Sequence, residues 1–367
     1  MTPARNSTTA GTPPERSLHG ANVLILGGTG SLGRRLLHRL ASDQVGHVDS
    51  VTVFSRDESK QHAMRLEINH ATNGKDHAFY RDSASRVRFV IGDVRNFADV
   101  RRAVDRADVI FHAAALKHVP TCEYAGGATV DTNVYGAINL ARAINECGRT
   151  EKHIIGISTD KACKPVNLMG MTKAIQERIL IQAALDCPWA RFANVRYGNV
   201  MASRGSVVPF FIDQVRAGKP IPITDVRMTR FLITLDESVD LVLAAFLRAA
   251  TGETLLPMVP SARVVDMAYA VAGRSDYPTE ITGIRAGEKI HEILLSEEEL
   301  PRSEVRGANL VILPILPELR THEPEDVNFQ FADEYSSAQN NLDLAQVRAL
   351  FEQHRLTADT APATLGF

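Results

Sequence analysis

The sequence predicts an α/β fold, in which a Rossmann-type doubly wound parallel sheet carries a smaller C-terminal α/β lobe. Two observations lead to this prediction. Short apolar, β-branched segments alternate with longer helical patterns through the first two hundred residues, which is typical of a parallel sheet covered by helices on both faces. A glycine-rich turn follows the first apolar segment and opens a helical pattern, as in sheets that bind a dinucleotide.

The composition is that of an ordinary globular protein and excludes several classes. The chain has 367 residues, of which 44% are hydrophobic and 23% charged, and this length allows one large domain and a smaller lobe. Its net charge of -2 does not favour nucleic acid or an anionic membrane surface as a partner, and no apolar run is long enough for a transmembrane helix. The four cysteines form no C-x-x-C pair, so we expect no metal site and a reduced, cytoplasmic location.

Changes in composition divide the chain into four regions. Residues 1–19 are rich in Pro, Thr, Ser and Arg without an apolar core, which predicts a disordered leader rather than a secretion signal. Residues 20–200 contain the predicted sheet, and residues 201–300 are expected to form most of the smaller lobe. Residues 301–367 turn polar and irregular before a short helical pattern at 344–354, so we expect them to pack on the outside.

The first strand, residues 22–26, leads into a G-x-x-G-x-x-G turn and then into a helix over residues 34–40. Glycines at such a junction let backbone N–H groups approach a pyrophosphate, which the positive end of the helix stabilises. The strand before the turn and the helix after it distinguish this pattern from an ordinary tight turn. The candidate dinucleotide-binding residues of this turn are Gly27, Thr29, Gly30, Ser31, Leu32 and Gly33.

The second strand, residues 50–54, ends in Ser55, Arg56 and Asp57. An NAD site usually has a carboxylate at this strand end, where it binds the ribose hydroxyls. Here Ser55 takes that position and Arg56 follows it, and a guanidinium is suited to bind a 2′-phosphate and to stack on adenine. NADP is therefore favoured over NAD, although Asp57 lies within reach of a ribose and keeps NAD as the alternative. Lys60 belongs to the same group of candidates.

The next two strands end in further candidates for binding the cofactor. Strand 89–91 is followed by Asp93 and Val94, and the carboxylate is able to accept a hydrogen bond from the adenine amino group. Strand 109–112 is followed by small residues that permit a close approach of the cofactor, and then by a lysine suited to a phosphate or a substrate. A long helix over residues 130–146 carries an asparagine that can reach back to the sheet. These candidates are Ala113, Ala114, Ala115, Lys117 and Asn133, whereas His112 and His118 are expected to be structural.

The fifth predicted strand covers residues 153–157, and the stretch that follows it departs from the Tyr and Lys pattern of short-chain dehydrogenases. Asn167 is placed to cap a helix on which Met169 and Lys173 share one face. Short-chain dehydrogenases have Tyr and Lys at this spacing, where the Tyr carries a proton and the Lys holds the nicotinamide ribose. A thioether cannot carry a proton. Either the site is inactive, or its acid–base chemistry comes from Thr159-Asp160-Lys161.

The second half of the chain places polar residues beyond another strand, residues 192–197. Ligands of open α/β sheets bind beyond the carboxyl ends of the strands, so Asn199 lies where a substrate is expected. Guanidinium and ammonium groups suit a diphosphate, which predicts a nucleotide-linked substrate. The cations are Arg204, Arg230, Arg285 and Lys289. The remaining predicted elements are helices at 207–215, from Asp236 onward and at 263–272, and a strand at 281–284.

Seven motifs occur in one order along the chain: Gly27-Gly28-Thr29-Gly30-Ser31, Phe54-Ser55-Arg56-Asp57, His112-Ala113-Ala114-Ala115-Leu116-Lys117, Ser158-Thr159-Asp160-Lys161, Arg196-Tyr197-Gly198-Asn199, Met228-Thr229-Arg230-Phe231 and Arg285-Ala286-Gly287-Glu288-Lys289. Together they resemble the UDP-N-acetylglucosamine 4,6-dehydratases of the extended short-chain dehydrogenase/reductase superfamily, over residues 20–300. The run 196–209 together with Met169 is most similar to the soluble capsule-type members that also invert C5. Membrane-anchored members share this Met but have an added transmembrane region, and flagellin-glycosylation members carry Tyr.

The resemblance implies an NADP-dependent lyase (a hydro-lyase) that makes a UDP-2-acetamido-2,6-dideoxy-4-hexulose for polysaccharide or glycoconjugate biosynthesis. Its substrate would be UDP-N-acetylglucosamine or a related UDP-sugar. The resemblance also implies a tightly held NADP or NAD that is regenerated in each turnover, and a homo-oligomer, either a dimer or a hexamer. Two rival functions use the same fold and cofactor, namely a nucleotide-sugar epimerase, which preserves the mass of its substrate, and a non-catalytic NADP-binding regulator.

The resemblance assigns roles to individual residues as well. Lys161 is the base at C5, Asp160 the acid at the C6 hydroxyl, and Thr159 serves the C4 hydroxyl, while Lys173 orients the nicotinamide ribose beside Met169. Burial and the charge of Lys173 are expected to lower the pKa of Lys161, so that it is partly neutral. Further cofactor contacts are expected from Tyr197, Gly198 and Asn199. Substrate contacts are expected from Lys117, His118, Asn199, Arg204, Val208, Pro209, Arg230, Arg285 and Glu288.

Overall fold

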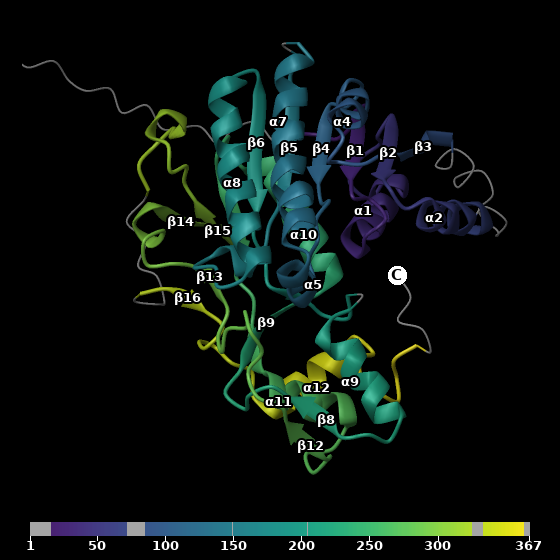
Figure 1. The fold of residues 1–367 in the computed structure, drawn as a ribbon, viewed down its shortest axis with the longest axis vertical. Coiled ribbons are helices and arrows are strands. Elements are labelled where there is room, and N and C mark those ends of the chain that lie inside the picture. The colour runs from purple at the N-terminus through teal and green to yellow at the C-terminus, as the bar shows by residue number, and fades with distance from the viewer. Residues whose placement is uncertain (1–15, 72–84, 149, 204, 325–332, 363–367) are drawn as a thin grey trace, which may run out of the picture.

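The computed structural model describes residues 16–71, 85–148, 150–203, 205–324 and 333–362. A large sheet with helices on both faces forms the upper part of the molecule in Figure 1, and a smaller group of helices and short strands lies below it. The predicted α/β class, with a Rossmann-type parallel sheet, is confirmed.

The main sheet has the strand order β14-β15-β10-β6-β5-β4-β1-β2-β3. The pairs from β10 to β3 are parallel, while β15 and β14 extend one edge in antiparallel fashion. The chain runs from β1 outward to β3 and then crosses back to β4, and such a reversal of strand order leaves a crevice at the carboxyl ends of the strands. The strands are β1 (Asn22–Leu26), β2 (Ser50–Ser55), β3 (Val87–Ile91), β4 (Val109–His112), β5 (Lys152–Ile157), β6 (Ala190–Val195), β10 (Thr254–Pro257), β14 (Ser303–Arg306) and β15 (Asn309–Ile312).

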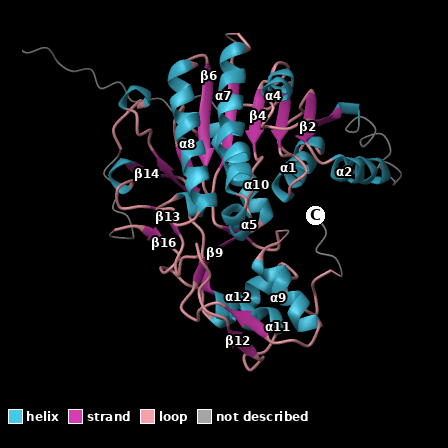
Figure 2. Ribbon diagram, in the orientation of Figure 1, coloured by secondary structure: helices cyan, strands magenta, loops and turns pink. Residues whose placement is uncertain are grey.

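Helices cover both faces of this sheet (Figure 2). Leu36 of α1 and Val242 of α10 belong to the apolar core on one face, whereas Val100 of α4, Leu140 of α7 and Leu180 of α8 belong to the core on the other. The central strands are thus buried from both sides, which explains their nearly continuous apolar sequence. These helices are α1 (Ser31–Ala41), α2 (Glu58–Ala71), α4 (Phe97–Val104), α7 (Gly136–Glu146), α8 (Leu168–Asp186) and α10 (Leu235–Arg248), with α5 (Val119–Tyr124) and α6 (Gly126–Val130) between β4 and α7.

A separate apolar core holds the smaller part of the molecule together. Phe211 of α9, Met267 of α11 and Phe351 of α12 are all buried in it. Two small sheets, β11-β9-β7 and β12-β8, complete this part, and β13 pairs with β16. The elements are β7 (Asn199–Val200), α9 (Val207–Arg216), β8 (Ile221–Ile223), β9 (Thr229–Ile233), β11 (Ser261–Arg263), α11 (Val264–Ala272), β12 (Thr279–Ile281), β13 (Ile293–Leu295), β16 (Tyr335–Ser336) and α12 (Leu344–Gln353).

The predicted boundaries differ from the structure in several places. Residues 301–367 were expected on the outside, but β14 and β15 extend the main sheet and α12 packs in the smaller core. Each of these strands has only four residues, and Ser303–Arg306 is largely polar, so no apolar run marks them. Within the predicted lobe 201–300, α10 and β10 instead belong to the main sheet and its cover.

Smaller differences concern individual elements. The predicted helix 130–146 contains a π-helical turn at Asp131–Tyr135, and the predicted strand 281–284 lies at Thr279–Ile281 instead. Of the predicted leader, residues 1–15 lie outside the described residues, whereas Leu18 is buried and Arg16 donates to the Leu247 carbonyl at 3.0 Å. Within the described ranges, no helix is long and apolar enough to cross a membrane. The same residues contain no group of three His, Cys, Asp or Glu side chains arranged for a metal ion.

Candidate active site

A cavity of about 620 Å³ lies where several strands of the main sheet end. Its wall is built from the residues that follow β1, β2, β3, β4, β5 and β6, with contributions from α8 and from the chain around β7. Parallel strands end at one edge of a sheet, so segments far apart in the sequence meet here.

The glycine-rich turn after β1 allows a very close approach of two strands. Gly27 has a φ of +80°, and a Cβ on it would lie 2.6 Å from the Cα of Ala114, after β4. A Cβ on Gly33 would lie 2.6 Å from the Cα of Gly28. The first turn of α1 borders the cavity, and Gly30 precedes it without a side-chain cap, so its N–H groups are available to an anion. This cradle fits the pyrophosphate of a dinucleotide.

The residues after β2 form a cationic corner of the cavity. The Asp57 carboxylate caps α2, because it accepts a hydrogen bond from the Lys60 N–H at 2.9 Å, and it also pairs with the Lys60 Nζ at 2.7 Å. The hydrogen bond from Lys60 lowers the pKa of Asp57. Arg56 is exposed at the cavity rim. The Asp57 carboxylate is therefore already engaged within the chain.

The carboxylate predicted to accept from the adenine amino group has a strong partner of its own. Asp93 borders the cavity beside Val94, but it pairs with the Arg95 guanidinium at 2.6 Å, and this hydrogen bond lowers the pKa of Asp93. Asn133 does not border the cavity. Its side chain accepts from the Leu116 N–H at 2.8 Å and donates to the Leu116 carbonyl at 3.0 Å, so it fastens the loop after β4 from behind.

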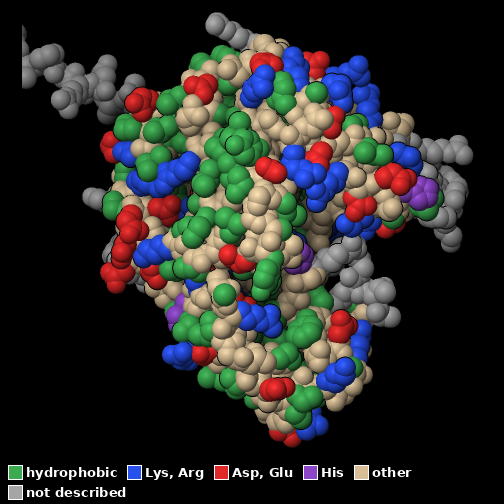
Figure 3. Space-filling view, in the orientation of Figure 1, with side chains coloured by type: hydrophobic (Ala, Val, Ile, Leu, Met, Phe, Trp, Pro, Cys, Tyr) green, Lys and Arg blue, Asp and Glu red, His purple; other side chains and the backbone are tan. Residues whose placement is uncertain are grey.

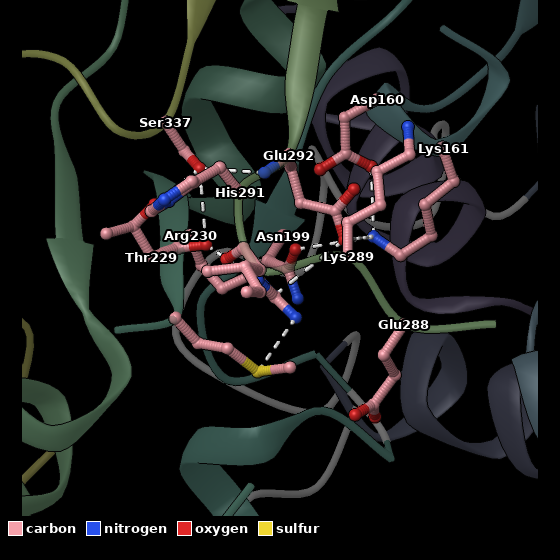
Figure 4. Close-up of polar contacts among 12 residues, drawn as sticks. Asp160, Lys161, Asn199, Thr229, Arg230, Glu288, Lys289, His291, Glu292 and Ser337 are labelled. Carbon is pink, nitrogen blue, oxygen red and sulfur yellow. Dashed lines mark hydrogen bonds and ion pairs between the residues drawn. The ribbon is translucent and has the colours of Figure 1, made fainter. Parts of the chain in front are cut away.

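The turn after β5 brings three proposed proton carriers together, of which Figure 4 shows Asp160 and Lys161. The Thr159 hydroxyl donates to Asp160 Oδ1 at 2.8 Å, and the Lys161 Nζ lies 3.0 Å from the same oxygen. Thr159 and Lys161 border the cavity, but Asp160 is completely buried behind them. In this arrangement the Asp160 carboxylate reaches the cavity only through its two neighbours.

A carboxylate that the sequence did not single out lies on the other side of Lys161. Glu292, just before β13, is buried and lies 3.4 Å from the Lys161 Nζ, and Asn199 Oδ1 lies 3.5 Å from it. Burial lowers the pKa of Lys161, but Asp160 and Glu292 together outweigh it, and the pKa is raised. The expectation of a lowered pKa was wrong, since it considered burial and Lys173 but not a second carboxylate.

The helix face predicted to hold the nicotinamide ribose also borders the cavity. Met169 and Lys173 lie there together on α8, one turn apart, and Asn167 caps this helix by accepting from the Gly170 N–H at 2.8 Å. Lys173 donates to Gln176 at 2.5 Å. Its burial lowers the pKa of Lys173 to about 7.

A buried ionic network supports this side of the cavity. Arg196 lies between two carboxylates, 2.7 Å from Glu177 and 2.8 Å from Glu299. Although burial lowers its pKa, the two carboxylates raise the pKa of Arg196 overall. Ser158, next to Thr159, donates to Glu177 in turn. The network thus anchors the turn after β5 to the segment after β13. Its members are too far apart in the chain to be paired by inspection of the sequence.

The expected cofactor residues are otherwise brought together, whereas most expected substrate residues are not. The cavity wall includes Gly27, Thr29, Gly30, Ser31, Leu32, Gly33, Ser55, Arg56, Asp57, Lys60, Asp93, Val94, Ala113, Ala114, Ala115, Lys117, His118, Lys173, Tyr197, Gly198 and Asn199. It also includes residues that were not predicted, among them Thr132, Ser203, Gly205 and Ser206. A run of small residues after Asn199 was the available signal for the last three.

The other expected substrate residues that the structure describes do not line this cavity. Val208 packs in the smaller core, and Arg230 is buried with its guanidinium bound to the carbonyls of Thr229 at 2.7 Å and Ile290 at 3.1 Å. The Glu288 carboxylate accepts from the Arg285 N–H at 3.4 Å, within one turn. Pro209, Arg285 and Glu288 do not border the cavity either, and Arg204 lies outside the described residues.

This chain is similar to known proteins both in sequence and in fold. A sequence model of the polysaccharide biosynthesis protein family matches residues 23–313. A UDP-glucose 4-epimerase of Rickettsia bellii is 41% identical over 292 residues, which are 78% of this chain and 80% of that protein. A UDP-N-acetylglucosamine 4,6-dehydratase (inverting) of Campylobacter jejuni is 41% identical over 281 residues, 76% of this chain and 78% of that protein. The X-ray structure of Pen from Bacillus thuringiensis is 31% identical, with a TM-score of 0.80, and covers 92% of this chain and 99% of that chain.

Proposed function

This chain belongs to the polysaccharide biosynthesis protein family, and from that premise we propose that it is a UDP-N-acetylglucosamine 4,6-dehydratase that uses NADP. The proposal rests on one observation above all. Thr159 and Lys161 line a cavity that fits a dinucleotide, and both contact the buried Asp160 carboxylate. Met169 lines the same cavity, but its thioether cannot carry a proton. A site that had merely lost its Tyr would not need this connected set of proton carriers.

A bound nicotinamide cofactor would supply reversible hydride transfer between the sugar C4 and C6 positions. The chain's own residues then account for the protons. The C4 hydroxyl gives its proton to Thr159 and Asp160 as the ketone forms. Lys161, once it is neutral, removes the acidified C5 proton. Asp160 passes its proton through Thr159 to the C6 hydroxyl, which leaves as water, and Lys161 returns a proton to C5, so the cycle ends in its starting protonation state.

NADP as the cofactor is supported by the corner after β2. Arg56 and Lys60 provide two cations there, and Asp57 is engaged by the helix it caps. A 2′-phosphate would be attracted to these charges, whereas a ribose hydroxyl would compete with Lys60 for the carboxylate.

A homo-oligomer is also part of the proposal. Apolar side chains are exposed on the outer surface of α7, α8 and the turn before α7, and Figure 3 shows apolar atoms gathered over these helices. The exposed residues include Tyr135, Ile138, Met171 and Ile175. Large exposed apolar patches commonly mark protein–protein contacts, and a second copy of the chain would cover this one.

A nucleotide-sugar 4-epimerase is the second candidate, because the Rickettsia relative bears that name at the same identity as the dehydratase. An epimerase needs one proton carrier at C4 and returns the hydride to C4, so it leaves Lys161 without a role at C5. The two reactions differ in the mass of the product, because only the dehydratase loses water.

The test is to incubate the purified chain with NADP and UDP-N-acetylglucosamine in heavy water and to follow the product by NMR and mass spectrometry. The proposal predicts loss of water, a 4-keto product and one solvent deuterium at C5. A product of unchanged mass would replace the dehydratase by the epimerase. No conversion of UDP-N-acetylglucosamine, with NADP bound, would contradict both functions for this substrate.

A further inference from the structure

Glu292 is held in place from several directions although it lies on a short segment between elements. Its backbone N–H donates to the Ser337 hydroxyl at 2.9 Å, and its carbonyl accepts from the Ser337 N–H at 2.8 Å. The Ser337 hydroxyl in turn lies 2.8 Å from the Thr229 hydroxyl on β9. The backbone of Glu292 is therefore tied to two other segments, and its side chain is directed at Lys161 (Figure 4).

Three oxygens lie around the Lys161 ammonium, two of them as hydrogen-bond acceptors and that of Glu292 as an ion-pair partner. An ammonium group has three N–H donors, and three oxygens surround it: Asp160 Oδ1 at 3.0 Å, Glu292 Oε1 at 3.4 Å and Asn199 Oδ1 at 3.5 Å. These come from the turn after β5, the segment before β13 and β7. A neutral amine would satisfy fewer of these oxygens, so the arrangement is built for the charged form of Lys161.

Of the cations described around these two buried carboxylates, Lys161 lies closest to both of them. Asp160 and Glu292 are both almost fully buried, and each has a second carboxylate oxygen without a hydrogen-bond partner. Arg230 Nε lies 3.8 Å from Glu292, and Lys289, whose Nζ donates to the Cys163 carbonyl at 2.6 Å, is the other cation nearby. Loss of the Lys161 proton would leave two buried carboxylates facing an uncharged amine, which is costly in a medium of low polarity.

We propose that Glu292 is a positioning residue that, together with Asp160, holds Lys161 protonated at the cavity wall and thereby sets the pH above which this lysine becomes a base. This inference rests on the proposed function for the role of Lys161 at C5. Glu292 would also stabilise the ammonium that forms when Lys161 takes up the C5 proton.

The first experiment is an NMR titration of the full chain labelled with ¹³C in its lysines, of which there are nine. The Lys161 signal is identified by its absence from Lys161→Ala. Glu292→Gln is expected to lower the titration midpoint of Lys161 by about one to two pH units, since a unit charge at this distance is partly offset by Arg230. Glu292→Asp keeps the charge with a shorter side chain, so a smaller shift is expected.

Glu253→Gln is the matched control. Glu253 is equally buried and pairs with Arg306 at 2.8 Å before β10, without contacting Lys161. This variant loses a buried carboxylate in the same way and should leave the Lys161 midpoint unchanged. An unchanged midpoint in Glu292→Gln, or an equal shift in Glu253→Gln, would overturn the inference. If Glu292→Gln does not fold, Glu292→Asp replaces it as the test. A lower Lys161 midpoint in Glu292→Asp would then support the inference, and an unchanged midpoint would overturn it.

Deuterium exchange at C5 gives a second readout. The pH at which exchange becomes half-maximal should move downward in Glu292→Gln by the same one to two units as the NMR midpoint. Uniformly slower exchange with an unmoved pH profile would show a merely structural role. Failure of the wild-type chain to dehydrate the sugar would refute the proposed function, while the NMR shift would still test Glu292. If the wild-type chain dehydrates the sugar but the Lys161 midpoint is unchanged in Glu292→Gln, only this inference is refuted.

Discussion

Replacing Gly27 by Ala should weaken both the fold and the binding of the cofactor. Gly27 has a φ of +80°, where an L-residue costs about 1–2 kcal/mol. A Cβ would also lie 2.6 Å from both the Cα and the N of Ala114, so β1 and the residues after β4 would have to separate. Overpacking of this kind typically costs about 1–3 kcal/mol. Together these effects predict that the free energy of unfolding falls by about 2–5 kcal/mol.

Gly273→Ala isolates the contribution of backbone conformation. Gly273 ends α11 with a φ of +69°, and a Cβ on it would meet nothing within 4 Å. Only the conformational cost of about 1–2 kcal/mol is then expected. Urea denaturation of both variants, followed by circular dichroism, gives the two free energies and their difference of about 1–3 kcal/mol. Equal losses in the two variants would refute the argument that Gly27 is required by the close approach of Ala114.

The same displacement should be measurable in the affinity for NADP. Moving the turn after β1 misplaces the N–H groups that border the cavity, and losing one hydrogen bond to a charged group costs about 1.5–3 kcal/mol. The Kd of NADP, measured by calorimetry on folded Gly27→Ala, should therefore rise about 10- to 100-fold, while Gly273→Ala retains the wild-type Kd. Wild-type affinity in folded Gly27→Ala would show that the cofactor does not lie against this turn.

Three further predictions concern the cavity. Arg56→Ala should raise the Kd of NADP about 10- to 100-fold and leave that of NAD within about twofold, because the lost guanidinium faces a 2′-phosphate; equal weakening of both would contradict the assignment. Lys161→Ala should abolish incorporation of solvent deuterium at C5, as followed by NMR, with the Kd of NADP unchanged, whereas persistent exchange would remove Lys161 from that role. The pKa of Lys173 is lowered to about 7 by burial, against about 10.4 in the unfolded chain. Between these values the unfolded chain binds more protons, so stability should rise with pH by up to about 1.4 kcal/mol per unit. Urea denaturation at pH 7, 8 and 9 should show this rise in the wild type and not in Lys173→Met, and parallel curves would show that Lys173 is not neutral in the folded state.

The sequence alone determined the features that depend on local pattern. The strand, glycine turn and helix around Gly27 identified the dinucleotide cradle, because that junction needs small residues at fixed positions. The four-residue spacing of Met169 and Lys173 placed both on one helix face and revealed the missing phenol. The polar residues at the ends of β2, β4 and β5 were expected to meet for a similarly general reason, since parallel strands end at one edge of a sheet.

Only the tertiary structure decided the features that depend on contacts between distant segments. Glu292 reaches Lys161 from far along the chain, and this contact reverses the expected direction of the Lys161 pKa shift. Arg196 gains its two carboxylate partners in the same way, and the four-residue strands β14 and β15 join the main sheet without an apolar run to mark them. A periodic pattern records which face of an element is buried, but not which charged side chain of another element will lie opposite it. The electrostatics of the site therefore had to come from the packing.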